Sequence, residues 1–279
     1  MLPLACDPII ELALREDLSA GDVTTEACIP EDARAVAHAV ARTPVVVCGG
    51  DVFARVFQKV DPSLAVERHV ADGARADAGA KLWTVRGSAR SILMGERTAL
   101  NFVQRMTGIA TVTRKYVDAL PPGSNKTRIT DTRKTTPGMR VLERWAVRCG
   151  GAHNHRNDLG SAALIKDNHI VAAGSVTAAI ERARAHAPHT SRIECEVTSL
   201  EELDQALAAG ADVVLLDNMK TETIKQAVTR TAGRALLEAS GGITLARVTE
   251  LAEAGVDAIS VGALTHSAPA ADIGLDFEG

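Results

Sequence analysis

The fold is decided by a strand–helix–strand pattern, clearest in the stretch IECEVTSLEELDQALAAGADVVLLDN, residues 193–218. Two short apolar runs, 193–197 and 213–216, enclose residues 200–208, where apolar positions recur at helical spacing. Gly210 follows at the position where a glycine commonly ends a helix. Two strands joined through a helix run parallel, so the stretch predicts one right-handed βαβ unit.

The same alternation repeats through the C-terminal half of the chain. We expect six strands, at residues 128–132, 163–166, 193–197, 213–216, 236–239 and 258–261. We expect helices at residues 139–148, 176–186, 200–208, 222–230 and 245–254. Six units do not establish a closed eight-stranded barrel. An open, incomplete α/β barrel of the TIM type and a doubly wound sheet fit this periodicity equally well.

Composition restricts the class of protein. Of the 279 residues, 46% are hydrophobic and 24% charged, a globular balance that excludes a largely disordered chain. The formal net charge of −4 disfavours nucleic acid as a general partner. Apolar runs stay well short of the roughly 18 residues of a membrane span, so we expect no membrane partner. Five scattered cysteines without a C-x-x-C pair predict neither a disulfide framework nor a zinc ribbon, and favour a reduced, cytoplasmic location.

Charged side chains gather at the carboxyl ends of the predicted strands. These ends share one face in parallel α/β folds, and ligands bind there, so residues distant in sequence should converge. The cationic or potentially cationic members are Arg133, Lys134, His155, Arg156, Lys166 and His169. Such a positive site on an acidic chain indicates a substrate with several carboxylates or phosphates.

Two acidic residues and a glycine-rich loop share this predicted face. Glu196 and Asp217 suit a divalent cation completed by phosphate oxygens, or ribose hydroxyls, and a buried ion pair with Lys or Arg is the alternative for Glu196. Ser240-Gly241-Gly242 follows the fifth strand, and a helix begins near Thr244. Backbone amides approach a ligand closely at glycines, and a helix N-terminus favours anions, so this loop is a candidate phosphate site.

Ten motifs, in order along nearly the whole chain, resemble the quinolinate phosphoribosyltransferase family. They are ALREDL (13–18), GDVTT (21–25), GERTALNF (95–102), GIAT (108–111), DTRKTTPG (131–138), NHR (154–156), LIKDNH (164–169), LDN (216–218), EASGG (238–242) and VGALTHS (261–267). The resemblance implies a mixed α/β N-terminal domain, residues 1–108 with a returning C-terminus at 266–279. An open α/β-barrel phosphoribosyltransferase domain at 109–265 is also implied.

The resemblance also implies an activity. A member would be a pentosyl-transferring glycosyltransferase of NAD biosynthesis, which converts quinolinate and phosphoribosyl pyrophosphate into nicotinate mononucleotide, pyrophosphate and CO2 with Mg²⁺. It would form a homodimer or a hexamer of dimers, with Arg97 donated across the subunit interface.

Residue roles follow from the matching motifs. Catalytic roles are implied for Lys134, Lys166, Glu196 and Asp217. Substrate binding is implied for Arg97, Thr132, Arg133, Lys134, His155, Arg156, Lys166, Glu196 and Asp217. Phosphate binding is implied for Ser240, Gly241, Gly242, Val261, Gly262 and Ala263. Glu196 and Asp217 would also hold Mg²⁺, directly or indirectly.

Two departures from the family pattern and three competing hypotheses accompany this interpretation. Ser19 and Ala152 stand where the family usually has glycine. The related molybdenum-transport-associated protein shares several motifs, although the intact segment 165–169 favours the quinolinate enzyme. Lys166 at a strand end is also compatible with a Schiff-base lysine of an aldolase-like barrel. A non-catalytic phosphate-binding module is the third hypothesis.

Overall fold

The structure, a computed structural model, describes residues 6–123 and 126–279. The chain divides into two compact units. Unit 1 comprises Met1–Arg114, Thr135–Gly151 and Ala263–Gly279, and unit 2 comprises Lys115–Lys134 and Ala152–Gly262. Residues 135–151, which the motif order assigns to the barrel, therefore group by compactness with unit 1.

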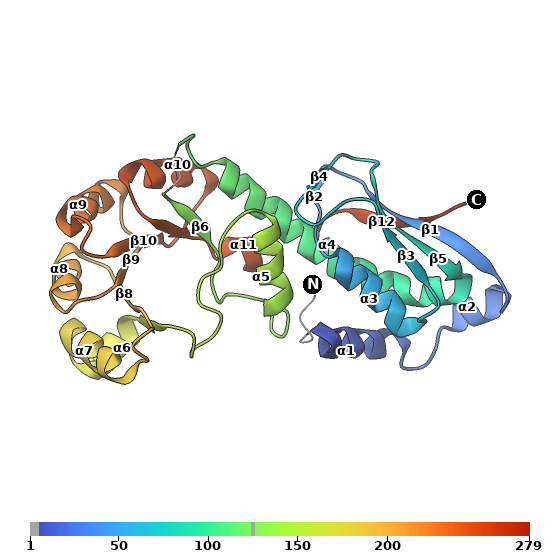
Figure 1. Cartoon of the computed structure of the whole chain (residues 1–279), viewed down its shortest axis with the longest axis horizontal. Helices are drawn as coiled ribbons and strands as arrows, with labels where there is room; N and C mark the ends of the chain where they lie inside the picture. The colour runs from blue at the N-terminus through green and yellow to red at the C-terminus, as the bar shows by residue number, and fades with distance from the viewer. Residues whose placement is uncertain (1–5, 124–125) are drawn as a thin grey trace. The chain divides into compact units, whose positions relative to one another are not determined.

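Unit 1 is built on an antiparallel sheet with the strand order β12-β1-β5-β3 (Figure 1). Its strands are β1 (Arg34–Ala41), β3 (Ala65–Arg68), β5 (Lys81–Ser88) and β12 (Ile273–Phe277). A separate short pair joins β2 (Val45–Val46) to β4 (Arg75–Ala76). Because β12 pairs with β1, the C-terminal segment returns to the sheet formed by the first ninety residues.

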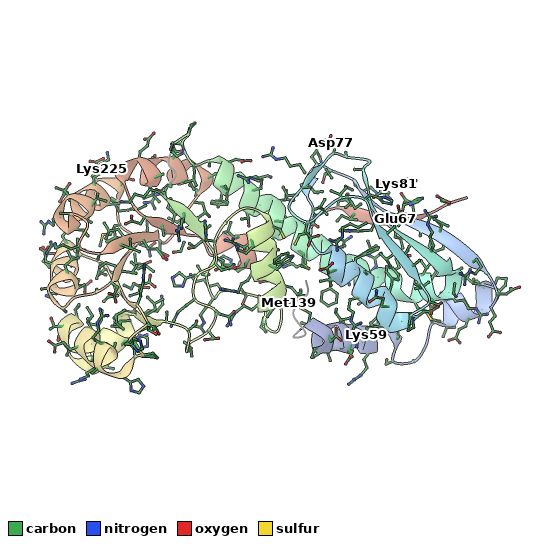
Figure 2. All side chains as sticks on the ribbon, in the orientation of Figure 1. Lys59, Glu67, Asp77, Lys81, Met139 and Lys225 are labelled. Carbon is green, nitrogen blue, oxygen red and sulfur yellow. The ribbon has the colours of Figure 1, made fainter. Side chains whose placement is uncertain are left out.

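Helices supply the rest of unit 1. They are α1 (Asp7–Leu18), α2 (Val23–Cys28), α3 (Gly50–Val60), α4 (Ala89–Asp118, whose last four residues fall in unit 2), α5 (Arg140–Cys149) and α11 (Ala263–His266). The buried face of α3 carries Phe53 and Phe57, and Phe53 stacks on Trp83 of β5 with the ring centroids 5.0 Å apart. Lys59 extends from α3 to α1, where it pairs with Glu11 at 2.5 Å (Figure 2). Apolar packing and surface charge thus fix α3 from opposite sides.

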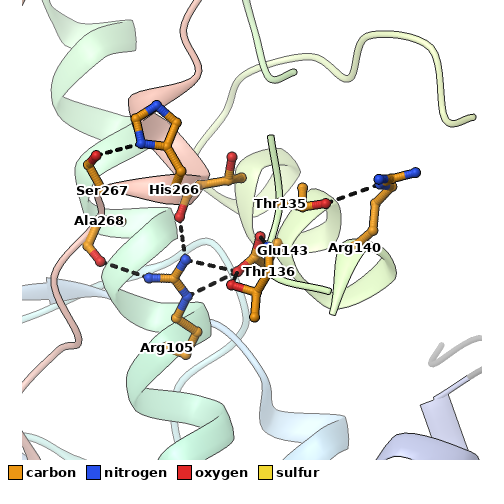
Figure 3. A network of polar contacts seen from close by, with 9 residues as sticks. Arg105, Thr135, Thr136, Arg140, Glu143, His266, Ser267 and Ala268 are labelled. Carbon is orange, nitrogen blue, oxygen red and sulfur yellow. Dashed lines mark hydrogen bonds and ion pairs between the residues drawn. The ribbon is translucent and has the colours of Figure 1, made fainter. Parts of the chain in front are cut away.

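A buried ion pair joins the long helix α4 to α5 (Figure 3). Glu143 of α5 has no exposed surface, and its Oε1 accepts from Nε and Nη2 of Arg105 at 3.0 and 2.9 Å. The same carboxylate accepts the Thr136 hydroxyl at 2.8 Å and the Thr136 N–H at 3.1 Å. Arg105 also donates to the carbonyls of Thr265 and Ala268. These contacts explain why residues 135–151 group with unit 1.

Unit 2 is a parallel six-stranded sheet with the order β6-β11-β10-β9-β8-β7. Its strands are β6 (Arg128–Thr130), β7 (Ala163–Ile165), β8 (Ile193–Val197), β9 (Val213–Asp217), β10 (Leu236–Ser240) and β11 (Ala258–Ser260). The order advances in one direction from β7 to β11 and then reaches β6. A doubly wound sheet would reverse instead. The sheet is therefore an α/β barrel left open between its first two strands, as predicted.

The helices of unit 2 follow one another along the outside of this sheet (Figure 1). They are α6 (Asp167–Ala173), α7 (Val176–His186), α8 (Leu200–Ala208), α9 (Thr221–Thr231) and α10 (Leu245–Ala254). The predicted strands agree with the structure to within two residues. The sequence did not predict α6, because this helix buries none of its residues and so carries no apolar stripe. None of the helices in the described ranges combines the length and apolar character needed to cross a membrane.

The buried pair predicts a large stability effect in unit 1. Glu143→Ala leaves the Arg105 guanidinium without its carboxylate, so we expect the free energy of unfolding to fall by about 3–5 kcal/mol. Glu222→Ala is the matched control, since Glu222 pairs with Lys225 on the exposed surface of α9 and should change that value by less than about 0.5 kcal/mol. Urea unfolding followed by circular dichroism measures both. Equal losses in the two variants would contradict the role of the buried pair.

Candidate active site

A cavity of about 560 Å³ lies within unit 2, at the carboxyl ends of its strands. Its lining residues are Thr132, Arg133, Lys134, His155, Arg156, Leu164, Lys166, Glu196, Leu215, Asp217, Asn218, Glu238, Ser240, Gly241, Gly242 and Ser260. Eleven of these were singled out from the sequence. The expected convergence of distant strand ends is therefore present in the structure.

Strand geometry places the lining residues in two layers. Side chains two positions apart on a strand point to the same face of a sheet. Asp217 and Ser240, which are register partners at the ends of β9 and β10, form the outer layer. Glu196, Leu215 and Glu238 are register partners in the layer beneath, and Lys166 directly follows β7 beside Glu196. The outer layer is thus polar, whereas the layer beneath combines two carboxylates with an apolar side chain.

A buried carboxylate positions the segment that carries His155 and Arg156. Asp131, which follows β6 and has no exposed surface, accepts the His155 N–H at 2.7 Å and the Asn154 Nδ2–H at 2.6 Å. His153 forms an isolated parallel bridge with Thr130 beside β6. The segment therefore lies against the first strand in an extended form. Asp131 holds His155 and Arg156 at the cavity through the backbone.

His155 lies among two buried carboxylates. Its Nε2 is 3.3 Å from Oε2 of Glu194 and 3.5 Å from Oε1 of Glu238. Burial by itself lowers the pKa of His155, but the hydrogen bonds and charges of the two glutamates outweigh it and raise this pKa to about 10. The cationic ring cannot accept at Nδ1, so the 2.7 Å contact from the Arg156 N–H must open when the ring is doubly protonated. Burial also raises the pKa of Glu194.

The guanidinium groups of Arg133 and Arg156 repel one another at this cavity. Burial, and next the charge of Arg133, lower the pKa of Arg156. Nη1 of Arg156 donates to the Ala162 carbonyl at 3.0 Å, which orients the side chain. Guanidinium groups stay charged in proteins, so their mutual repulsion is relieved when an anion binds between them. The site is electrostatically suited to an anion with more than one carboxylate or phosphate.

Lys166 and Glu196 form an ion pair in the same cavity. Nζ of Lys166 is 2.5 Å from Oε2 of Glu196, whose side chain is mostly buried. Glu196 therefore has the lysine partner that the sequence left as an alternative, although the pair is not buried as expected, because Lys166 is about half exposed. Asp217 also lines the cavity, and its Oδ2 accepts from Nδ2 of Asn218 at 2.8 Å. Carboxylate oxygens facing a cavity are the donors that Mg²⁺ prefers, so Glu196 and Asp217 fit this ion chemically.

The loop after β10 depends on two glycines. Gly241 has φ +91°, and a Cβ at this position would lie 2.2 Å from Oδ1 of Asn218. Gly242 has φ +57° with open space around it. Asn218, with φ +54°, is one of two non-glycine residues in the described part of the chain with positive φ. The close approach of the two loops therefore requires glycine at 241.

Five predicted residues lie outside this cavity. His169 is on α6, and its Nδ1 accepts the Lys166 N–H at 2.9 Å. Val261 is buried in the core of unit 2, and its N–H donates to the Thr130 carbonyl at 3.0 Å. Gly262 follows it, and Ala263 begins α11 in unit 1. Arg97 is on α4 and lines a pocket of about 350 Å³ within unit 1. Their binding roles stay predictions, although the Val261 N–H is already engaged by protein.

Three functional candidates were not assigned a role from the sequence. Glu238 and Asn218 line the cavity, and Glu194 contacts His155. The signal for Glu194 and Glu238 is a carboxylate inside an apolar strand, which is costly without a partner. Asn218 follows Asp217 directly, but its packing against Gly241 depends on a tertiary contact. No local pattern predicts such a contact.

The two departures from the family pattern do not strain the backbone. Ser19 ends α1 with φ −59°, which any residue adopts. Ala152 is buried and is not among the positive-φ residues of the described chain. Glycine is not required at either position.

The fold is an open α/β barrel, and its cavity is lined by five basic side chains and three carboxylates at the carboxyl ends of the strands. The family model of the quinolinate phosphoribosyl transferase N-terminal domain matches residues 22–107, and that of the C-terminal domain matches residues 109–276. The chain belongs to the quinolinate phosphoribosyltransferase family.

Relatives and solved structures agree with this assignment. Nicotinate-nucleotide pyrophosphorylase [carboxylating] from Mycobacterium leprae is 47% identical over 274 residues, which cover 96% of this chain and 95% of the relative. Quinolinate phosphoribosyltransferase [decarboxylating] 2 from Nicotiana glauca is 39% identical, with 97% of this chain and 81% of the relative covered. The crystal structure of NadC from Streptococcus pyogenes superposes with a TM-score of 0.94 at 41% identity, covering 100% of this chain and 99% of that one.

The glycine pair gives a testable contrast. Gly241→Ala combines an unfavourable φ with a clash against Asn218, so we expect a loss of about 2–4 kcal/mol in the free energy of unfolding of unit 2. Gly242→Ala adds only the φ cost, about 1–2 kcal/mol. Chemical denaturation of the two variants measures the difference. A loss in Gly242→Ala that matched or exceeded the loss in Gly241→Ala would show that the Asn218 contact is unimportant.

Proposed function

We propose that this chain is a quinolinate phosphoribosyltransferase that acts in NAD biosynthesis. It transfers the phosphoribosyl group of phosphoribosyl pyrophosphate to quinolinate, with loss of CO2, and forms nicotinate mononucleotide and pyrophosphate. The observation that carries the proposal is the convergence of Arg133, His155 and Arg156 in one cavity with the carboxylates of Glu196 and Asp217. The names of the related enzymes support the same reaction.

The cationic part of the cavity suits quinolinate, a pyridine ring with two adjacent carboxylates. A guanidinium group binds a carboxylate bidentately, and two of them can address two carboxylates. The fixed positions of Arg156 and His155, set by Ala162 and Asp131, orient the ring plane. The role of Lys134 is to add a further positive charge at the edge of the same cavity.

The other part of the cavity suits phosphoribosyl pyrophosphate. Glu196 and Asp217 can accept hydrogen bonds from ribose hydroxyls. Ser240, Gly241 and Gly242 present backbone to the 5′-phosphate or the pyrophosphate, close to the N-terminus of α10. The remaining assignments, Thr132 for substrate and Val261, Gly262 and Ala263 for phosphate, belong to the same proposal.

Catalysis is then electrostatic and positional. The ring nitrogen of quinolinate attacks the anomeric carbon of the ribose as the bond from that carbon to the pyrophosphate oxygen breaks. The nitrogen becomes positive, so the ring accepts the electron pair of the carbon–carboxylate bond when CO2 leaves, and a proton then adds to that carbon. Lys166, held against Glu196, keeps a positive charge near the reacting groups. The reaction needs no covalent nucleophile.

Mg²⁺ belongs to this proposal through Glu196 and Asp217. These carboxylates would hold the ion together with oxygens of the substrate, as is usual for Mg²⁺ at phosphate sites. When bound, the ion stabilises the negative charge that develops on departing pyrophosphate. The structural support is the donor chemistry of the two residues.

The competing hypotheses are less compatible with these contacts. A Schiff-base lysine must be a neutral amine to attack a carbonyl, whereas the Lys166 ammonium is paired with Glu196 at 2.5 Å. A simple phosphate-binding module does not need carboxylates such as Glu196 and Asp217 in the same cavity as the cations. The family assignment disfavours the molybdenum-transport-associated protein.

The proposed assembly is a homodimer, or a hexamer of dimers, in the cytoplasm. Arg97 would complete the quinolinate site of the neighbouring subunit. Its support within the chain is its place on the rigid helix α4, at the edge of a largely apolar pocket with Leu12 and Phe102. Leu12 itself is 60% exposed in the single chain, as expected of a residue that a partner covers.

A direct assay tests the reaction. We expect the purified protein, mixed with quinolinate, phosphoribosyl pyrophosphate and Mg²⁺, to release nicotinate mononucleotide and CO2 in equal amounts, measured by chromatography and by label from the leaving carboxylate. Nicotinate in place of quinolinate is the control, because it lacks one of the two carboxylates. Faster turnover of nicotinate, or product without CO2, would contradict the proposal.

Subunit mixing tests the role of Arg97. We expect Arg97→Ala and Lys166→Ala to be inactive alone, and their mixture to recover up to about a quarter of wild-type activity after subunit exchange in a dimer, because half of each mixed dimer is intact. Arg133→Ala mixed with Lys166→Ala is the control, since both residues line the cavity of one chain and no intact site can form. Native mass spectrometry measures the exchange. Proven exchange without recovery would place Arg97 outside the shared site.

A further inference from the structure

Three potential metal ligands meet inside unit 1. Sγ of Cys48, a carboxylate oxygen of Asp72 and Sγ of Cys149 all lie within 4.8 Å of one another. They come from the segment between β2 and α3, from the loop between β3 and β4, and from the last turn of α5. We infer that Cys48, Asp72 and Cys149 form a binding site for a thiophilic divalent cation of the Zn²⁺ type.

The distances suit this kind of ion. Zn²⁺ binds thiolate sulfur at about 2.3 Å and carboxylate oxygen at about 2.0–2.2 Å, so tetrahedral ligand atoms lie roughly 3.4–3.8 Å apart. The ligand atoms, which lie within 4.8 Å of one another, therefore need to approach by up to about 1.0–1.4 Å. Side-chain rotation of the cysteines supplies a movement of this size without displacing the backbone.

Hydrogen bonds from neighbouring residues hold the Asp72 carboxylate in place, with one oxygen within 4.8 Å of both sulfur atoms. Its Oδ2 accepts from the Gly49 N–H and from Nε1–H of Trp145, both at 3.1 Å. Its Oδ1 accepts from the Gly50 N–H at 3.1 Å. Hydrogen bonds of this kind fix the ligand geometry in metal sites. The carboxylate is thus held before any ion binds.

The cysteines are also fixed by their surroundings. The Thr107 hydroxyl accepts the Cys48 N–H at 3.2 Å and donates to the Cys48 carbonyl at 3.0 Å, which joins this residue to α4. Gly73, with φ +87°, brings the loop of Asp72 against α5, so that a Cβ there would lie 3.2 Å from the Cys149 carbonyl. Three separate segments are therefore packed closely around the cluster.

The carboxylate distinguishes a cation site from a redox pair of cysteines. A disulfide needs two sulfur atoms and no third group, whereas an anionic oxygen held beside two sulfurs is useful to a cation. Cys48 is buried, but Cys149 and Asp72 are partly exposed. A water molecule can therefore reach the ion from the side of Cys149 and Asp72 and serve as its fourth ligand. An ion here would join three segments of unit 1 and stabilise it, independently of the proposed transferase reaction.

Metal binding to the full-length protein tests the inference. After treatment with chelator and reductant, we expect equilibrium dialysis to show one tightly bound Zn²⁺ per chain, and a rise in the thermal unfolding midpoint. Co²⁺ in its place should give the intense absorption of thiolate coordination. Cys149→Ser and Asp72→Asn should each lose the stoichiometric ion and the midpoint rise. Trp145→Phe removes only the support of Asp72 and should weaken the affinity about 10–100-fold.

Two controls separate this site from other donors in the described chain. Cys28→Ser, at an exposed cysteine on α2, should bind Zn²⁺ as the wild type does. His155→Ala should also retain the ion, because it alters the second group of possible ligands, formed with Glu194 and Glu238. Circular dichroism of each variant without metal confirms that it folds. Zn²⁺ retained by folded Cys149→Ser, Zn²⁺ lost in His155→Ala, no stoichiometric binding, or a Cys48–Cys149 disulfide in the protein as isolated would each overturn the inference.

Discussion

The burial of the Asp131 carboxylate is the constraint on which the site depends. A buried charge is tolerated only when hydrogen-bond donors surround it, and Asp131 meets this need with the backbone of His155 and the side chain of Asn154. One of these partners, His155, is itself a cation of the cavity, and Arg156 follows it directly in the same segment. Stability and ligand binding are coupled here, because the segment 153–156 cannot move away from β6 without leaving this carboxylate unsatisfied.

Carboxylates also lie beneath and beside the cations throughout unit 2. Glu194 and Glu238 favour a charged His155, and Glu196 pairs with Lys166. The cavity therefore contains carboxylates next to its basic side chains and is not uniformly positive. An incoming dianion meets cations whose positions are already set, so little reorganisation is needed when it binds.

The sequence predicted the parts of this structure that depend on local periodicity. The strands of unit 2 and the residues at their ends follow from alternation and from the shared direction of parallel strands, so Lys166, Asp217 and Ser240 could be placed without coordinates. The short helix α6 was not predicted, because it buries none of its residues and therefore has no apolar stripe in its sequence. The placement of α5 in unit 1 depends on the Glu143–Arg105 pair, which joins positions 38 residues apart. Cys48, Asp72 and Cys149 are separated by 24 and 77 residues in the sequence, so no spacing rule could group them.

The pairing of β12 with β1 has a consequence for how the protein is made. Strand β1 spans Arg34–Ala41, whereas its partner spans Ile273–Phe277 and is translated after all of unit 2. During synthesis, the edge of strand β1 therefore stays unpaired until residues 273–277 have been translated, which happens after the barrel of unit 2. An unpaired edge invites association with other nascent chains. The pairing of β12 with β1 closes this edge, so unit 1 is completed only after the strands of unit 2 have been synthesised.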